Sequence, residues 1–263
     1  MKLIIAFLLF ASTILPQEKI EIQNNLKKFF DYYNVKGSFL LYNLKEDSYT
    51  GYNIERCRKR FLPASTFKIF NSLVGIETGI IPDSNFIFYW DSTKYRVNNW
   101  NQDLILRKAF QYSCVPCYQN LARKVGMERM KFYIEKEHYG NEVLTGPIDF
   151  FWLNATLKIS QIEQIKFLKK LYNKELGFSL KAMQIVKHIM LIENKPDYKL
   201  RAKTGWGIDK EGLNIGWYVG FLERNNNVYF FATNIESDSP DDNFGNARVE
   251  ITKSILRNLS FYN

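Results

Sequence analysis

The chain has 263 residues, of which 46% are hydrophobic and 24% charged, and this composition excludes an intrinsically disordered protein. Two histidines and three cysteines are too few for the common zinc ligand sets, so we predict no metal site. The formal charge of +9 leaves nucleic acid or another anionic surface open as a partner until the motifs are considered. The length allows one large domain with a substantial core.

The first segment, residues 1–17, has one lysine, then an uncharged run from Leu3 to Leu15. A membrane span needs about 20 apolar residues, so this run is too short for one. Its length and flanks are typical of a secretory signal peptide. We therefore expect export to the periplasm or the cell exterior, without stable membrane association after cleavage. An N-terminal anchor or a first buried helix is the alternative. No linker or repeat interrupts residues 18–263, which predicts a single domain.

Strand patterns occur near both ends of this domain. Residues 37–44 and 48–54 are rich in β-formers and are separated by three charged residues, as in an antiparallel hairpin. Three further runs follow near the C-terminus, at residues 199–205, 215–223 and 227–235. A tight polar turn separates the last two of them.

The middle of the chain has helical periodicity instead. Residues 66–79 and 160–171 are predicted helices, the second with Ser160 and Glu163 at the spacing of a capping box. A last helix is predicted at residues 246–259. Strands at both ends with helices between them predict an α+β fold: an antiparallel β-sheet from both chain ends, flanked by helices, with an inserted mainly helical region. Residues distant in sequence would then surround one cleft.

The strongest local motif is Ser65-x-x-Lys68, where a loop enters the first of these helices. This spacing places the amine beside the hydroxyl on one helix face, and the helix N-terminus offers backbone N–H groups to an oxyanion. A serine nucleophile needs a base, and lysine can serve when burial lowers its pKa well below about 10. Alone, the motif also fits a helix-capping serine with a solvated lysine.

A second motif, Lys203-Thr204-Gly205, lies at the end of a predicted strand and is followed by Trp206. Neighbouring residues face opposite sides of a regular strand, so a shared role for Lys203 and Thr204 needs a twist or a strand end. The glycine removes a side chain that would keep a ligand from the strand edge. Ser113, between the two motifs in sequence, could hydrogen-bond to Lys203.

Five motifs then occur in a recognisable order: Ser65-Thr66-Phe67-Lys68, Ser113-Cys114-Val115, Tyr139-Gly140-Asn141, Phe151-Trp152-Leu153 and Lys203-Thr204-Gly205. From about residue 36 to the C-terminus, the chain resembles the class D (oxacillinase-type) serine β-lactamases. The related class A enzymes and penicillin-binding proteins have Ser-Asp-Asn where this chain has Ser-Cys-Val. The resemblance implies a penicillin-binding/serine β-lactamase-like fold.

The resemblance also implies a mechanism. Ser65 would attack the β-lactam carbonyl, with the backbone N–H groups of Ser65 and Trp206 as the oxyanion hole. Lys68 would be carboxylated by CO2 or bicarbonate and serve as general base, with no other cofactor. The indole N–H of Trp152 would hold this carbamate, and three apolar side chains would surround it: Phe67, Val115 and Leu153.

Ser113, beside Lys203, would relay a proton to the leaving nitrogen. The substrate-binding residues implied by the resemblance are Thr204, Gly205, Trp206 and Arg248, with Thr204 and Arg248 on the substrate carboxylate. Tyr139, Gly140 and Asn141 would shape the cleft wall.

Other functions stay open at this point. The same motifs occur in β-lactam sensor domains, which stay acylated, and a cell-wall D,D-peptidase would also use an acyl-serine. A generic basic binding domain fits less well, because no basic cluster with interleaved aromatic residues predicts nucleic-acid binding. Homodimer formation is left open.

The histidine and cysteine residues carry no predicted chemistry. Cys114 and Cys117 could form a redox pair or half a zinc site, but we expect buried small side chains with one or two free thiols in the protein. Their redox state is left open. We expect His138 to be solvated or packed, because Ser-x-x-Lys chemistry needs no histidine.

Overall fold

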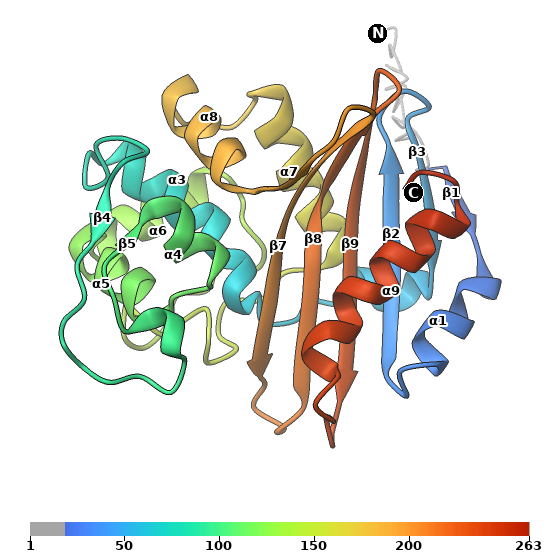
Figure 1. Ribbon diagram of the computed structural model, residues 1–263, viewed down its shortest axis with the longest axis horizontal. Helices are drawn as coiled ribbons and strands as arrows, with labels where there is room; N and C mark the ends of the chain where they lie inside the picture. The colour runs from blue at the N-terminus through green and yellow to red at the C-terminus, as the bar shows by residue number, and fades with distance from the viewer. Residues whose placement is uncertain (1–18, 263) are drawn as a thin grey trace, which may run out of the picture.

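The computed structural model describes residues 19–262, and the signal peptide predicted at residues 1–17 lies outside them. Its strands are β1 (Ile20–Ile22), β2 (Lys36–Asn43), β3 (Ser48–Tyr52), β4 (Ile87–Phe88), β5 (Leu104–Ile105), β6 (Leu191–Asn194), β7 (Tyr198–Ile208), β8 (Asn214–Arg224) and β9 (Asn227–Ser237). Seven of them form one sheet in the order β1-β3-β2-β9-β8-β7-β6 (Figure 1). β1 is parallel to β3, and the other neighbours in this sheet are antiparallel.

The α-helices are α1 (Lys27–Asp31), α2 (Ile54–Arg58), α3 (Lys68–Glu77), α4 (Leu106–Gln111), α5 (Val115–Val125), α6 (Met127–Lys136), α7 (Gln161–Asn173), α8 (Leu180–Ile189) and α9 (Phe244–Asn258). The described part of the chain also contains three 3₁₀ turns: η1 (Asn24–Leu26), η2 (Ala64–Phe67) and η3 (Asn98–Trp100). No helix within residues 19–262 combines the length and the apolar character needed to cross a membrane.

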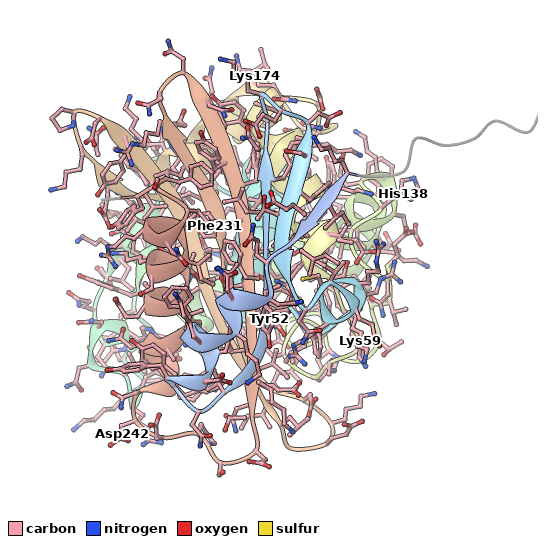
Figure 2. The ribbon with its side chains drawn as sticks, turned by 90° about the vertical axis from the view of Figure 1, so that its right-hand side faces the viewer. Tyr52, Lys59, His138, Lys174, Phe231 and Asp242 are labelled. Atoms are coloured by element: carbon pink, nitrogen blue, oxygen red, sulfur yellow. A yellow bond between two sulfur atoms is a disulfide. The ribbon has the colours of Figure 1, made fainter. Side chains whose placement is uncertain are left out.

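The sheet separates two layers of helices. α1 and α9 cover one face, while α7 packs on the other against β2, β8 and β9 (Figure 1). Figure 2 views the α1 and α9 side, where Phe231 belongs to a buried cluster with residues of α9. The inserted region with α3 to α6 and α8 lies on the side of the sheet where β7 and the edge strand β6 lie (Figure 1). The predicted α+β class, with a sheet built from both chain ends and a helical insertion, is confirmed.

Local sequence explains several boundaries. Asn225 and Asn226 have φ of 54° and 55°, so the β8–β9 turn uses the left-handed conformation that asparagine tolerates in tight hairpins. Ser160 and Glu163 form the predicted capping box of α7. The final helix begins at Phe244, two residues before its predicted start.

Two elements near the motifs differ from expectation. The helix predicted at residues 66–79 begins at Lys68, because Ala64–Phe67 form a 3₁₀ turn. The Lys203-Thr204-Gly205 motif does not end its strand: β7 continues to Ile208, paired with β8 throughout. The 3₁₀ turn carries Ser65, and the continued strand carries Trp206 alongside that turn.

Candidate active site

Ser65 and Lys68 lie together at the junction of η2 and α3. Ser65 is 7% exposed and follows Ala64, whose φ of 47° is unusual for a residue with a Cβ. The Lys68 amine is buried and donates a hydrogen bond from Nζ to Ser65 Oγ at 2.9 Å. Burial lowers the pKa of Lys68 to about 7, so a large share of this amine is neutral near pH 7. A neutral amine beside a hydroxyl can accept its proton.

Ser113 and Lys203 meet from opposite sides of the site. Ser113 lies between α4 and α5 with a φ of 51°, and its Oγ accepts a hydrogen bond from Lys203 Nζ. This is the contact that the sequence suggested. The same Nζ donates to the carbonyl oxygen and to Oγ1 of Thr204, at 3.0 and 3.3 Å. Lys203 and Thr204 leave opposite faces of the strand, but the long lysine side chain bends so that its Nζ reaches Thr204.

The charge environment of Lys203 is unusual. Burial lowers its pKa well below the usual range, and the nearby positive charges of Lys68 and Arg248 lower it further. Within residues 19–262, no carboxylate forms an ion pair with any of these three side chains. The site therefore presents basic groups without acidic partners and favours an anionic ligand.

Gly205 permits close packing of β7 against the turn that carries Ser65. A Cβ at Gly205 would lie 2.9 Å from the carbonyl oxygen of Pro63 and 3.1 Å from Cγ2 of Thr66. Any larger residue would push the strand away from η2. The glycine thus brings the backbone of Trp206 toward the turn that carries Ser65. This packing role comes in addition to the ligand access expected from sequence.

Aromatic side chains form the wall behind this turn. Phe67 and Trp152 are buried and stacked, with ring centroids 5.4 Å apart, and the Ala64 N–H donates to the Trp152 carbonyl at 3.2 Å. Val115 and Leu153 are half-buried. The indole nitrogen of Trp152 is buried and has no hydrogen-bond partner. Buried N–H groups are rarely left unpaired, so this donor is available to a group that the unmodified chain does not supply.

Arg248 approaches from the first turns of α9. Its side chain is half-buried, and its Nε and Nη1 atoms are buried without a hydrogen-bond partner. Burial lowers the pKa of Arg248 to about 10, which leaves the guanidinium charged at neutral pH. A planar cation with free donors suits a carboxylate.

The cysteines depart from the sequence-based expectation. Cys114 and Cys117 form a disulfide across the first turn of α5, so they are not simply buried small side chains. Their spacing of three at a helix start brings the two sulfurs together. Cys57 is the free thiol of the described residues; it is buried, and burial raises its pKa to about 12.

His138 has no place in this site. Its side chain is 80% exposed and its Nδ1 lies 3.1 Å from Glu142 Oε1, at the periphery of the molecule in Figure 2. Within residues 19–262, no group of three or more His, Cys, Asp or Glu side chains could hold a metal ion.

Three aromatic residues that lie beside the motifs were not predicted from the sequence. The Tyr118 ring lies 5.2 Å from Lys68 Nζ, and the Phe110 ring lies 5.4 Å from Lys203 Nζ. Trp217 Nε1 donates to the Leu62 carbonyl at 2.8 Å, which anchors the loop that leads to Ser65. In sequence these residues fit ordinary core positions, and only the fold places them beside the motifs.

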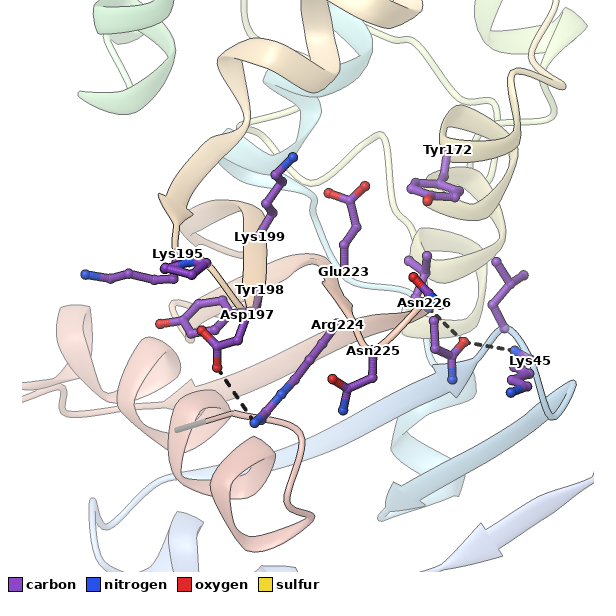
Figure 3. A pocket seen from close by; sticks show the side chains of 14 residues that line it. Lys45, Tyr172, Lys195, Asp197, Tyr198, Lys199, Glu223, Arg224, Asn225 and Asn226 are labelled. Atoms are coloured by element: carbon purple, nitrogen blue, oxygen red, sulfur yellow. Dashed lines mark hydrogen bonds and ion pairs between the residues drawn. The ribbon is translucent and has the colours of Figure 1, made fainter.

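A cavity of about 830 Å³ lies elsewhere, where β7 begins and β8 and β9 join (Figure 3). Asp197, Glu223 and Arg224 line it together with three lysines, but none of the predicted site residues does. Arg224 pairs with Asp197, and Glu223 pairs with Arg201. We assign no catalytic role to this cavity.

Known proteins resemble the chain over most of its length. The family model described as penicillin binding protein transpeptidase domain matches residues 24–257. β-Lactamase OXA-48 of Klebsiella pneumoniae is 42% identical over 229 residues, which cover 87% of this chain and 85% of the relative. The crystal structure of the class D β-lactamase YbXI from Nostoc superposes with a TM-score of 0.86 at 46% identity, covering 90% of this chain and 99% of that one. The C-terminal domain of the Bacillus licheniformis BlaR penicillin-receptor has a TM-score of 0.89 at 34% identity, covering 95% and 100%.

Proposed function

Because this chain belongs to the class D β-lactamases, we propose that it hydrolyses the β-lactam ring of penicillin-type antibiotics through an acyl-enzyme on Ser65 and so gives antibiotic resistance. The observation that carries this proposal is the buried contact between Lys68 Nζ and Ser65 Oγ at 2.9 Å. It unites a nucleophile with a base whose pKa burial has lowered to about 7.

In the acylation step, Ser65 Oγ forms a bond to the lactam carbonyl carbon and transfers its proton to the base at Lys68. The backbone N–H groups of Ser65 and Trp206 stabilise the oxyanion. The carbon–nitrogen bond then breaks, and the nitrogen takes a proton through the Ser113 hydroxyl, which Lys203 holds by its hydrogen bond. Water hydrolyses the resulting ester, which restores Ser65 and leaves a carboxylate on the product.

We further propose that Lys68 is N-carboxylated. The neutral amine adds to CO2, forms a carbamate and releases one proton. Three features support a carbamate at Lys68. They are the lowered pKa of Lys68, the unpaired indole N–H of Trp152, and the two basic side chains of Lys203 and Arg248, which have no acidic partner among residues 19–262. When present, the carbamate supplies the general base for acylation and for the hydrolytic water.

Substrate binding would use the basic side of the cleft. Arg248 has unpaired donors, and the Thr204 hydroxyl lies 3.3 Å from Lys203 Nζ. Together they would bind the carboxylate of a penicillin, with Gly205 and Trp206 along the strand. The disulfide between Cys114 and Cys117 supports our proposal that the protein acts in the periplasm or outside the cell, where disulfides persist. We also propose that residues 18–263 form one catalytic domain.

The test compares wild type with Ser65→Ala and Lys68→Ala on benzylpenicillin in bicarbonate buffer. Turnover should vanish in the serine variant and fall about 100- to 10,000-fold in the lysine variant, the usual range for loss of a general base. Lys181→Ala, an exposed lysine of α8, is the matched control and should keep full activity. Carbon-13 NMR with labelled bicarbonate should show one carbamate signal that disappears in Lys68→Ala. Undiminished turnover by Lys68→Ala would contradict the proposal.

A sensor function is the second candidate, favoured by the likeness to the BlaR penicillin-receptor domain. A sensor would bind one equivalent of penicillin covalently, without later release. Intact-mass measurement over time separates the two: the hydrolase loses the acyl group within the assay, and the sensor keeps it. A D,D-peptidase would instead cleave a D-Ala-D-Ala peptide in a parallel assay.

A further inference from the structure

The indole of Trp206 is 43% exposed, yet several groups hold it in place. Its Nε1 donates a hydrogen bond to Asn214 Oδ1 at 2.9 Å, and its ring centroid lies 5.2 Å from that of Phe244. Gly245 faces the ring so closely that a Cβ there would lie 3.3 Å from Trp206 Cζ3. The ring therefore has a polar anchor at its nitrogen and apolar contacts with α9.

The same ring faces the guanidinium of Arg248, whose Cζ lies 5.8 Å from the ring. Guanidinium groups pack favourably on indole faces. Because Nε and Nη1 of Arg248 have no hydrogen-bond partner, hydrogen bonds from these atoms do not orient the group. The contact with Trp206 is thus an orienting contact for this cation before an anion arrives.

Asn214 is placed to control this contact. It begins β8, pairs with Ile208 of β7 and is only 9% exposed. The connecting turn is itself held: Asp209 Oδ1 accepts from the N–H groups of Glu211 and Leu213, each at 2.9 Å. A rigid turn and a buried amide therefore give the indole N–H a fixed acceptor.

We infer that Asn214 is a positioning residue for the substrate carboxylate: it anchors Trp206, and the anchored ring orients Arg248. This inference rests on the proposed function, because it assigns the carboxylate of a β-lactam to Arg248. Asn214 itself does not touch the substrate. Its loss frees the indole to rotate, which removes the support of the guanidinium and weakens binding of the carboxylate.

The test uses benzylpenicillin and its methyl ester, which lacks the carboxylate charge. In Asn214→Leu, kcat/KM for the acid should fall roughly 3- to 10-fold, the fold-change that corresponds to one neutral hydrogen bond, mainly through KM. For the methyl ester, kcat/KM of Asn214→Leu should stay within twofold of the wild-type value. Where turnover of the ester is too slow to follow, its rate of acylation of Ser65, measured by intact mass, replaces it.

Trp206→Phe keeps a ring but removes the N–H, so it provides the matched variant. Trp206→Phe should show the same selective loss of kcat/KM on the acid. The double variant should lose no more than either single variant, because both substitutions remove the same hydrogen bond. Equal losses on acid and ester, or multiplying losses in the double variant, would overturn the inference. A wild type that opens neither compound would instead overturn the proposed function.

Discussion

Lys203 Nζ donates a hydrogen bond to the Ser113 hydroxyl across 90 residues of sequence. The lysine lies on β7 of the sheet, and the serine lies at the corner between α4 and α5 in the helical insertion. This contact joins the two parts of the molecule on either side of Ser65. Changes at either end should therefore affect the chemistry more than the fold.

The lowered pKa of Lys68 predicts the pH dependence of activity. Carboxylation needs the neutral amine, which predominates above about pH 7 and is lost as the pH falls below that value. At a fixed low CO2 concentration, kcat should therefore fall below pH 7, approaching about tenfold per pH unit well below it. Because CO2 traps the neutral form, more CO2 should shift this acid limb to lower pH. An acid limb whose position does not change with the CO2 concentration would argue against carboxylation.

Trp152→Phe should weaken carboxylation while the packing on Phe67 is largely kept. A hydrogen bond to a charged group contributes about 1.5–3 kcal/mol, so the CO2 concentration for half-maximal activity should rise about 10- to 100-fold. Titration of activity with bicarbonate at pH 7.5 measures this value. Saturating bicarbonate should restore much of kcat. An unchanged half-saturation point would show that the indole N–H has another role.

Gly205→Ala should reduce both stability and activity. The added Cβ would lie 2.9 Å from the Pro63 carbonyl, so β7 and the Ser65 turn must separate. We expect a loss of about 1–3 kcal/mol in the free energy of unfolding, read from urea denaturation, together with a large fall in kcat. Gly79→Asn is the control, because Gly79 has open space and a φ of 74° that asparagine tolerates. Wild-type kcat in Gly205→Ala would contradict this account.

The Cys114–Cys117 disulfide should contribute modestly to stability and little to chemistry. It closes a very short loop, for which chain entropy predicts about 2 kcal/mol. Double substitution by alanine should lower Tm by roughly 4–8 °C and leave kcat within a few-fold of wild type. Thiol titration of the unfolded, unreduced protein should detect one thiol, from Cys57. Three titrating thiols would refute the bridge.

Local patterns in the sequence were sufficient where the chemistry is local. The hairpin at residues 225–226, the Ser160 cap and the Ser65–Lys68 pair each depend on residues within one turn of each other, so spacing alone predicted them. The helix start near Ser65 was misplaced because η2 runs directly into α3, and side chains three residues apart lie close together in both a 3₁₀ turn and an α-helix.

The sequence by itself determined which residues can do chemistry and in what order they occur, because nucleophile, base and cations are properties of side chains. Only the tertiary structure decided which of them meet and with what pKa. Burial of Lys68, the contact of Lys203 with Ser113, and the anchoring of Trp206 by Asn214 depend on segments brought together by the fold. Desolvation is the physical reason: the neighbours that remove water from an amine lie far from it along the chain.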